Sequence, residues 1–322
     1  MAPAILLSGV LLLWGPAWAS PTAIAPPPRG WSRVVFLDVG QGDATLLWPA
    51  GSDPFLVDAG GVPGGAFDVG RRVTVPAAWA VGARRLSHLV LTHGDPDHIG
   101  GAPAVLRALP PSDVWEGIPV PRHAGLQDMR ARAAAARVPW REVRAGETMR
   151  AGAASIRVLN PPAPDWERQK VRNDDSIVLD VRVGNMSVLL PGDITASVEP
   201  QVSAQLTPAP LTILKAPHHG SAGSSSPALV AAAHAAAVVF SAGARNPFGH
   251  PAPVVIDRYR AAGAAIFRTD EDGAVFVDTD GHDVVIWTWT SHRKVTLAAG
   301  SSQSRPTANH EGHEGHEGHE DK

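Results

Sequence analysis

The sequence predicts an α/β fold in which two packed β-sheets are covered by helices. Short apolar segments of strand length recur along the chain, and segments with helical periodicity lie among them in both halves. Glycine and proline are abundant, with 32 and 30 residues, which favours a loop-rich α/β architecture over a helical bundle. At 322 residues the chain is long enough to bury a full hydrophobic core.

The expected strands begin with a meander of three short apolar segments at 34–37, 44–47 and 55–57. A helical stretch around 75–81 separates this meander from a longer strand at 86–92. Further strands are expected at 155–159, 176–183, 186–190, 212–215, 237–240, 264–267, 274–277 and 284–289. Helices are expected at 102–109, 126–137, 195–205, 227–234 and 253–262.

The N-terminal end is not expected to be part of the fold. An apolar run precedes Ala17-Trp18-Ala19, which matches a signal-peptidase site, so residues 1–19 are expected to be a signal peptide, although no Lys or Arg precedes the run. The run is too short for a transmembrane anchor. Residues 20–30 form a proline-rich linker. We therefore expect a secreted or periplasmic protein whose mature chain has no transmembrane anchor.

The C-terminal end is a low-complexity segment. Residues 298–322 are of low complexity and end in a repeat of His, Glu and Gly from His310 onward, a composition that cannot build a core, so this tail is expected to be disordered. Two interpretations stay open: the tail gathers metal for the protein, or it only improves solubility. The folded domain is expected to span residues 31–297.

A dense group of metal-binding side chains follows the apolar segment that ends at Leu91. In the sequence His93-Gly94-Asp95-Pro96-Asp97-His98, two histidines and two aspartates lie within six residues. A single Asp or His at such a place often serves a turn or a helix cap. Four of them in this spacing favour a divalent metal site. The chain has no cysteine, which excludes thiolate ligands and disulfides.

Three later motifs place further polar side chains at strand ends. Asp193 follows the strand at 186–190, and the pair His218-His219 follows the strand at 212–215. Asn173 and Asp175 lie directly before the strand at 176–183. Because α/β proteins place their chemistry at strand ends, these motifs and the first group are expected to meet in one site.

In this order, the motifs resemble the metallo-β-lactamase superfamily and, more narrowly, the soluble hydrolase domain of ComEC-type competence (DNA-uptake) proteins. The resemblance covers about residues 31–290 and implies a four-layer αββα sandwich with one or two metals in a groove. The family's multi-helix membrane channel has no counterpart in this sequence, so the chain resembles the hydrolase domain on its own, and a role as a DNA importer does not carry over. The shared segments are 36–44, 57–61, 92–101, 173–179, 191–194, 217–221, 246–251 and 268–270.

The resemblance also assigns roles to individual residues. It implies metal ligands at His93, Asp95, Asp97, His98, Asp175, Asp193 and His219, where Asp193 is the bridging carboxylate. Asp95 and Asp175 stand where many members have histidines. Asp97 is expected to orient the attacking water and His218 to donate a proton, both as catalytic residues. Asp58 is expected to anchor the metal-binding loop.

Four further residues are expected to contact substrate: Asp43, Asn173, Asn246 and His250. A second candidate surface is the set of seven arginines between residues 122 and 150. These arginines are interpreted either as a solvated helix face or as a contact for a phosphate backbone.

The expected chemistry is hydrolysis by a metal-activated water. Two divalent cations, zinc or alternatively manganese, lower the pKa of a shared water to about 7. The aspartate at position 95 makes the site rich in oxygen, which suits phosphodiesters, nucleic acid included. Two alternatives stay open: hydrolysis of a carbon ester, lactone or β-lactam on the same fold, and metal binding without turnover.

Overall fold

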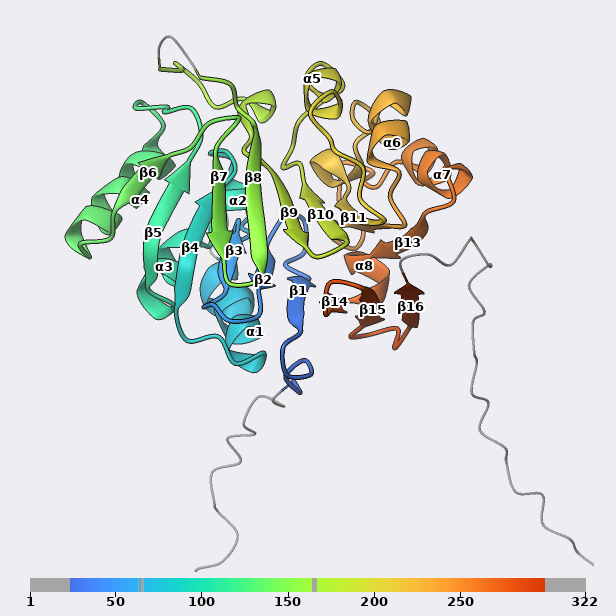
Figure 1. The fold of residues 1–322 in the computed structure, drawn as a ribbon. Helices are drawn as coiled ribbons and strands as arrows, with labels where there is room; N and C mark the ends of the chain where they lie inside the picture. Colours follow the sequence, from blue (N-terminus) through green and yellow to red (C-terminus); the bar gives the residue numbers. More distant parts are fainter. Residues whose placement is uncertain (1–23, 63, 65–66, 164–166, 299–322) are drawn as a thin grey trace, which may run out of the picture.

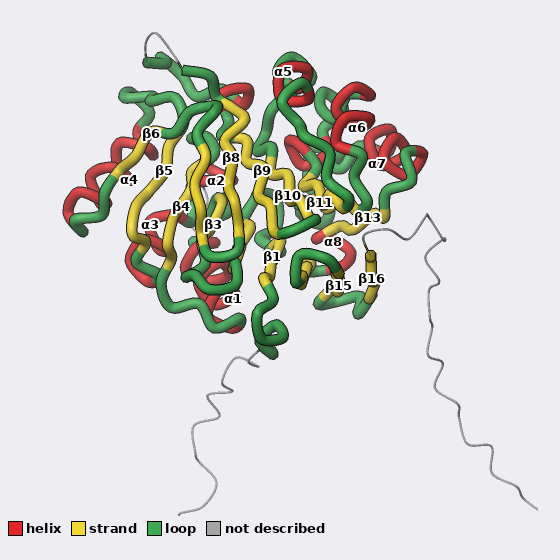
Figure 2. Tube along the Cα trace, in the orientation of Figure 1, coloured by secondary structure: helices red, strands yellow, loops and turns green. Residues whose placement is uncertain are grey.

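Two β-sheets pack face to face in the computed structural model, which describes residues 24–62, 64, 67–163 and 167–298 (Figure 1). Helices lie on the outer sides of the sheets (Figure 2). The expected signal peptide and residues 299–322 of the expected tail lie outside the described residues, so the predictions about them stay predictions. In the described part of the chain, no helix has both the length and the apolar character needed to cross a bilayer.

The first sheet has nine strands in the order β16-β15-β14-β1-β2-β3-β4-β5-β6. The expected meander is confirmed, because β1, β2 and β3 pair in antiparallel succession. From β3 to β6 the neighbouring strands are parallel. Its strands are β1 (Ser32–Phe36), β2 (Thr45–Trp48), β3 (Phe55–Val57), β4 (Leu86–Leu91), β5 (Pro111–Glu116), β6 (Trp140–Glu142), β14 (Val275–Thr279), β15 (Asp283–Thr288) and β16 (Lys294–Ala298).

The second sheet has seven strands in the order β13-β12-β11-β10-β9-β8-β7. The strands from β10 to β13 are parallel, and those from β7 to β10 are antiparallel. Its strands are β7 (Thr148–Ala151), β8 (Ala154–Asn160), β9 (Val178–Val183), β10 (Met186–Leu190), β11 (Leu211–Lys215), β12 (Ala237–Phe240) and β13 (Ala265–Arg268).

The helices cover the two outer faces. On the first sheet lie η1 (Gly70–Thr74), α1 (Val75–Ala80), α3 (Ala102–Ala108) and α4 (Ala124–Ala135), and on the second α5 (Glu199–Ser203), α6 (Pro227–Ala233) and α7 (Pro253–Ala261). Short helical turns follow strands or precede them: α2 (Pro96–Ile99), η2 (Asn173–Asp175), η3 (Pro217–Gly220) and α8 (Thr269–Asp272). The four-layer αββα sandwich is therefore confirmed.

The core is divided by the sheets into three layers. Along β1, Val34 and Phe36 face the space between the sheets, whereas Val35 faces the helices of the first sheet. This alternation follows from the two-residue period of a strand, and a strand buried on both faces is apolar throughout. Buried side chains of α5, α6 and α7 form the third layer with the second sheet.

Some expectations needed correction. The expected helix at 195–205 is shorter, because the Thr195 and Ser197 hydroxyl groups contact the Asp174 carboxylate and so hold the chain in a turn before α5. Four strands were not expected at all: β5, β6, β7 and β16. All four contain several polar residues and lie at or near a sheet edge, so they lack a continuous apolar run.

Candidate metal centre

Three buried histidines present one free ring nitrogen each at the edge where β4, α2 and η3 meet. His98 Nδ1 lies 2.7 Å from a carboxylate oxygen of Asp58, and His219 Nδ1 lies 2.9 Å from the Ser241 carbonyl oxygen. His93 Nδ1 lies 3.1 Å from the Thr92 hydroxyl. The Nε2 atoms of all three histidines are buried without a hydrogen-bond partner in the described part of the chain. A ring fixed through one nitrogen and open at the other is the usual arrangement of a metal ligand.

Carboxylates face these open nitrogens. Asp193 Oδ2 lies 3.3 Å from His98 Nε2 and 3.4 Å from His219 Nε2. Asp97 Oδ2 is 3.3 Å from His219 Nε2, and Asp95 Oδ2 is 3.4 Å from His93 Nε2. The structure thus brings together six of the seven ligands that the sequence suggests. Their donor atoms fit a divalent cation, because three buried Nε2 atoms that have no hydrogen-bond partner among the described residues converge with carboxylate oxygens there.

Asp43 lies within this cluster, whereas the sequence predicted only that it would contact substrate. Asp43, His98, Asp193 and His219 each offer a potential ligand atom, and these atoms lie within 4.8 Å of one another. Only 4% of Asp43 is exposed. The position of Asp43 follows from the glycine turn before it. A Cβ atom on Gly42 would collide with the Asp97 carbonyl oxygen, and the Asp43 N–H donates a hydrogen bond to the same oxygen at 3.2 Å. The turn therefore packs directly on the metal-binding loop.

Lys215 is the functional candidate that sequence reasoning missed. It is the last residue of the buried strand β11, it is 3% exposed, and its ammonium group is paired with the Asp43 carboxylate. Its Nζ atom also lies 3.2 Å from the Gly192 carbonyl oxygen and 3.4 Å from Asp193 Oδ1. The sequence does contain a signal that could have revealed it, namely a lysine at the end of an apolar strand. A lysine there is expected to be buried, and a buried charge needs a partner of opposite charge.

The cluster favours a positive charge at its centre. Burial alone would lower the pKa of His219, but the Asp193 and Asp43 carboxylates raise it to about 9. The pKa of His98 is likewise raised, against its burial, by Asp193 and Asp58. Burial would raise the pKa of Asp97, yet contact with His219 and the positive charges of His98 and His219 lower it to about 2. In the absence of a metal, protons on the histidines supply the charge that a cation would otherwise bring.

The backbone of the loops around the cluster is strained at three residues. Asp58, His218 and His219 have φ values of 59°, 50° and 54°, in the left-handed region that non-glycine residues seldom occupy. Such conformations persist where the surrounding structure enforces them, and they gather at functional sites. Here they turn the Asp58 carboxylate towards Thr92 and His98, and they turn His219 into the cluster.

Comparison with known proteins identifies the family. The model of the metallo-beta-lactamase superfamily matches residues 37–243, which include most of the cluster just described. The chain belongs to this superfamily. Members of the superfamily bind divalent metals, often two, and the Asp43, His98, Asp193 and His219 cluster is a candidate for such a site.

The curated relatives include competence proteins, which confirms the ComEC-type resemblance. ComE operon protein 3 of Bacillus subtilis (strain 168) is 29% identical over 262 residues, which are 76% of this chain and 32% of the relative. Competence protein ComA of Neisseria gonorrhoeae is 32% identical over 272 residues, 83% of this chain and 34% of the relative. The chain thus spans about one third of the length of these relatives. Among solved structures, the metallo-beta-lactamase fold protein YhfI from Bacillus subtilis is 14% identical, with a TM-score of 0.49, over 77% of this chain and 99% of that chain.

His218 occupies a different environment from its neighbour His219. Its side chain is 27% exposed, and its Nε2 atom lies 3.8 Å from Asp193 Oδ2 and 3.4 Å from the Asn173 amide nitrogen. Burial, together with the charges of His219 and Lys215, lowers the pKa of His218. It is therefore neutral near pH 7 and stands at the border of the cluster, where it can exchange a proton.

The turn before β9 does not bring its acidic side chains into the cluster. Both carboxylate oxygens of Asp175 face Arg168, at 3.0 and 3.3 Å, and the Asp174 carboxylate accepts from Thr195 and Ser197. The expected role of Asp175 as a ligand therefore has no support from its contacts and stays a prediction. Asn173 alone reaches the site, through His218.

The two late candidates for substrate binding also differ. The Asn246 side chain holds its own loop, because its oxygen accepts from the backbone N–H groups of Phe248 and His250 and its nitrogen donates to Gly243. His250 borders the cluster: its ring stacks on that of His219 with centroids 6.3 Å apart and meets that of His218 edge to face at 5.7 Å. His250 is thus placed to meet a substrate, whereas Asn246 shapes the loop that carries it.

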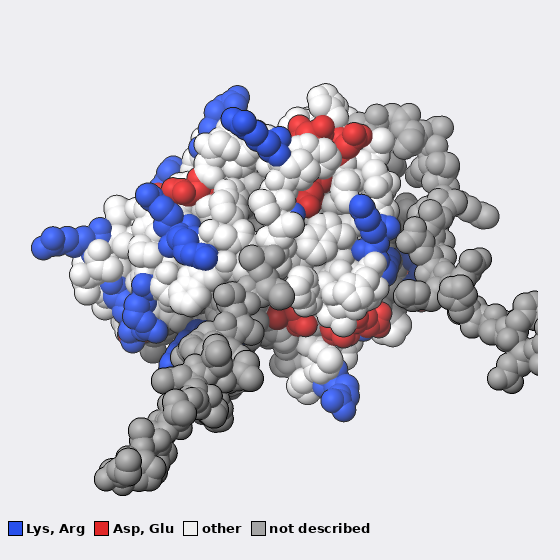
Figure 3. All heavy atoms as spheres, turned by 90° about the horizontal axis from the view of Figure 1, so that it is seen from below, with Lys and Arg blue, Asp and Glu red and all other residues white. Residues whose placement is uncertain are grey.

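The arginines between residues 122 and 150 are largely paired with acids. Arg130 pairs with Glu116, Arg132 with Asp128, Arg141 with Glu147 and Arg144 with Glu142. On the face seen in Figure 3, basic side chains likewise form separate groups rather than one continuous band. This supports the interpretation of these arginines as a solvated helix face rather than as a contact for a phosphate backbone.

Proposed function

We propose that this chain is a metal-dependent phosphodiesterase whose centre is the histidine and aspartate cluster. The observation that carries the proposal is the set of three fixed histidines whose buried Nε2 atoms face carboxylates without hydrogen-bond partners among the described residues. Structural polar groups are normally satisfied, so this arrangement is typical of a cation-binding site.

The chain's own residues fit the needs of phosphodiester hydrolysis. His93, Asp95, Asp97, His98, Asp193 and His219 would hold one or two divalent cations, zinc or manganese. Such cations activate water and neutralise the charge of a phosphodiester. The large share of carboxylates in this donor set favours phosphodiesters over carbon esters and makes manganese a credible alternative to zinc.

Proton transfer is assigned to two residues outside the histidine core. Asp97 stays ionised down to a pH of about 2, so its carboxylate can accept a hydrogen bond from the attacking water. His218 is partly exposed, and its pKa is lowered, so it can pass a proton to or from a leaving oxygen. The His250 ring stacks on that of His219 and meets that of His218 edge to face, so His250 is placed to orient the substrate.

The competence proteins among the relatives support nucleic acid as the source of the phosphodiester. The chain matches only about a third of those proteins, and DNA uptake as a whole is not part of the proposal. We also propose that the protein is exported and that the mature chain begins near Ser20. Sequencing the N-terminus of protein isolated from its native host tests this, and an intact Met1 in the cytosolic fraction contradicts it.

The substrate class can be tested with three chromogenic compounds. We expect protein loaded with zinc or manganese to hydrolyse bis(p-nitrophenyl) phosphate faster than a lactone or a cephalosporin. Asp193→Asn should abolish this activity, whereas Asp257→Asn, which alters an exposed acid on α7, should leave it unchanged. Faster lactone or cephalosporin hydrolysis would favour the carbon-ester alternative. Bound metal without any turnover would favour the metal-binding alternative.

A further inference from the structure

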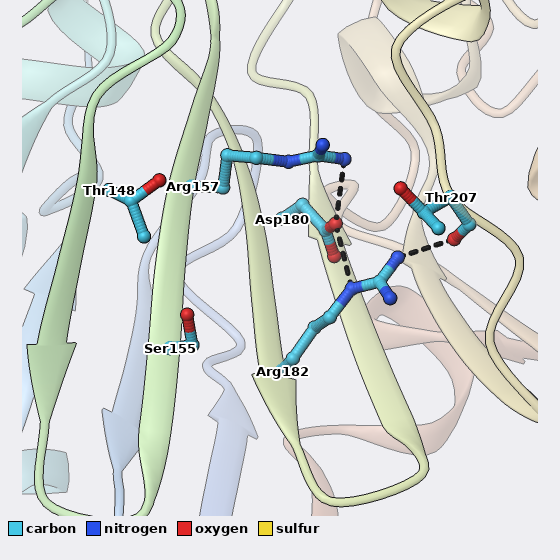
Figure 4. Close-up of a pocket in the computed structure, with 6 residues that line it drawn as sticks. All are labelled: Thr148, Ser155, Arg157, Asp180, Arg182 and Thr207. Atoms are coloured by element: carbon cyan, nitrogen blue, oxygen red, sulfur yellow. Dashed lines mark hydrogen bonds and ion pairs between the residues drawn. The ribbon is translucent and has the colours of Figure 1, made fainter.

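A second polar region lies on the outer face of the second sheet, on strands β7, β8 and β9. Figure 1 shows β7 and β8 without a helix over this face, whereas α5, α6 and α7 cover the strands further along the sheet. A hollow of about 200 Å³ opens here, and it is lined by Thr148, Ser155, Arg157, Asp180, Arg182 and Thr207 (Figure 4).

The register of the strands assembles this hollow. Thr148 pairs with Arg157, and Arg157 pairs with Asp180 on the next strand. Ser155, two residues before Arg157, pairs with Arg182. Because alternate residues of a strand share a face, these side chains all point outward while Ile156 and Val181 fill the core between the sheets.

The hollow carries an excess of positive charge. Asp180 is 1% exposed, and its carboxylate is fully satisfied: Oδ1 accepts from the Ser187 hydroxyl at 2.6 Å, and Oδ2 lies 3.3 Å from Arg157 Nη2 and 3.0 Å from Arg182 Nε. One carboxylate therefore faces two guanidinium groups, whose side chains are 33% and 30% exposed. One positive charge is left over where solvent has access.

Several hydrogen-bond donors around the hollow have no partner among the described residues. The guanidinium groups use Nη2 for the carbonyl oxygens of Gln205 and Thr207, but Nη1 of each arginine makes no hydrogen bond. The hydroxyl groups of Thr148 and Ser155 also make none; in Figure 4 they lie across the hollow from the guanidinium groups, which extend towards Asp180 and Thr207. Free donors from three strands and a net positive charge are suited to an anion with several oxygen acceptors.

A second hollow of about 280 Å³ adjoins the first and shares Arg182 and Thr207 with it. Its walls combine apolar residues, among them Leu189 of β10, Leu206 and, on α6, Ala231, with polar ones. A charged hollow that continues into a partly apolar one fits a molecule with an anionic end and a less polar body. Together the two hollows are of the size of small-molecule sites, roughly 300–1,000 Å³.

We propose that this face binds a phosphate monoester, with the phosphoryl group on Arg157 and Arg182 and the organic part in the adjoining hollow. A phosphoryl group matches the site because its oxygens can accept from guanidinium and hydroxyl donors on several sides at once. A nucleoside monophosphate has the required size and polarity. The site uses no residue of the metal centre, so it does not depend on the proposed phosphodiesterase activity.

The test is calorimetric titration of the full-length chain after removal of metal with a chelator and dialysis, so that the metal centre cannot hold phosphate through a cation. The probes are AMP, adenosine and inorganic phosphate. AMP should bind more tightly than phosphate, and adenosine most weakly. Arg182→Gln and Ser155→Val should each weaken AMP binding by about tenfold or more, because each removes donors or fills the hollow. Arg132→Gln, which removes an exposed arginine of α4, should have no effect.

Ser155→Val separates binding from folding, because it leaves every partner of Asp180 in place; its thermal transition should match that of the unaltered protein. AMP affinity unchanged in both Ser155→Val and Arg182→Gln overturns the proposal. Equal affinity for AMP and inorganic phosphate overturns the role of the second hollow. An equal loss in Arg132→Gln means that binding follows net charge alone, which also contradicts the proposed site.

Discussion

Two buried aspartates on neighbouring parts of the second sheet, Asp180 and Asp193, have opposite surroundings. Both carboxylate oxygens of Asp180 have partners, namely a serine hydroxyl and two arginines. Asp193 faces the Nε2 atoms of His98 and His219, which have no hydrogen-bond partner in the described part of the chain. A carboxylate that stabilises the fold closes its network, whereas a carboxylate that serves a metal leaves its neighbours open.

The largest expected effects come from removing one charge in each network. Asp193→Asn should reduce metal binding to less than a tenth of an equivalent and abolish hydrolysis while the chain still folds. Asp180→Asn should keep the metal but destabilise the fold by about 1–3 kcal/mol, because it leaves two partly exposed arginines without their charge partner. Metal analysis and urea unfolding of both variants test the contrast. The contrast fails if both variants lose metal equally or both lose stability equally.

The metal analysis requires protein without residues 298–322, because the histidines of this segment also bind metal and would mask the loss. In that shortened protein we expect up to two ions per chain. Less than half an equivalent after reconstitution would contradict a metal centre.

The next comparison is between the adjacent histidines. His219→Ala should lose metal and activity together, because His219 Nε2 faces both Asp193 and Asp97. His218→Ala should retain the metal and lose about 10²–10⁴-fold in turnover, because the proposed function makes His218 a proton donor at the border of the cluster. Parallel metal analysis and assays separate the two. Equal metal loss in both would mean that the pair chelates jointly, and the reverse pattern would exchange their roles.

Much of this centre could be predicted from the sequence, because its residues lie in short motifs. The spacing in His93-Gly94-Asp95-Pro96-Asp97-His98 is local, and so is the strand that ends before Asp193. Lys215 and the true place of Asp43 could not be predicted, since their pairing joins residues 172 positions apart and depends on the packing of both sheets. The contact of Asp175 with Arg168 was also hidden, because an arginine seven residues away carries no recognisable spacing.

The contact between Lys215 and Asp43, which the sequence did not predict, can be tested by a substitution at Lys215. Lys215→Met should destabilise the metal-free protein by about 3 kcal/mol, because it leaves the Asp43 carboxylate buried without a counter-charge next to Asp193. Added metal should then raise the melting temperature more than it does in the unaltered chain, since the cation supplies the lost charge. The double variant Asp43→Asn with Lys215→Met is the control and should recover most of the stability. An unaltered metal response in Lys215→Met would separate Lys215 from the metal centre.

The smallest expected effect is the pH dependence of the metal-free protein. The pKa of His219 is raised from 6.5 to about 9, so folding favours its protonated form. Its contribution to stability is complete below pH 6.5 and is lost as the pH rises towards 9. The pKa of Asp97 is lowered to about 2, so its contribution is complete above its ordinary value of 3.8 and is lost as the pH falls towards 2. In a chelator, the melting temperature should therefore fall between pH 6.5 and 9.

His219→Gln isolates this effect, because glutamine keeps a polar side chain but cannot take up the proton. Its melting temperature should change less than that of the unaltered chain between pH 6.5 and 9. Bound metal should reverse the trend in the unaltered chain, because a cation displaces the histidine proton and binds more tightly as that proton becomes easier to remove. The same pH slope in the unaltered chain and in His219→Gln would show that His219 does not carry the charge at the centre of the cluster.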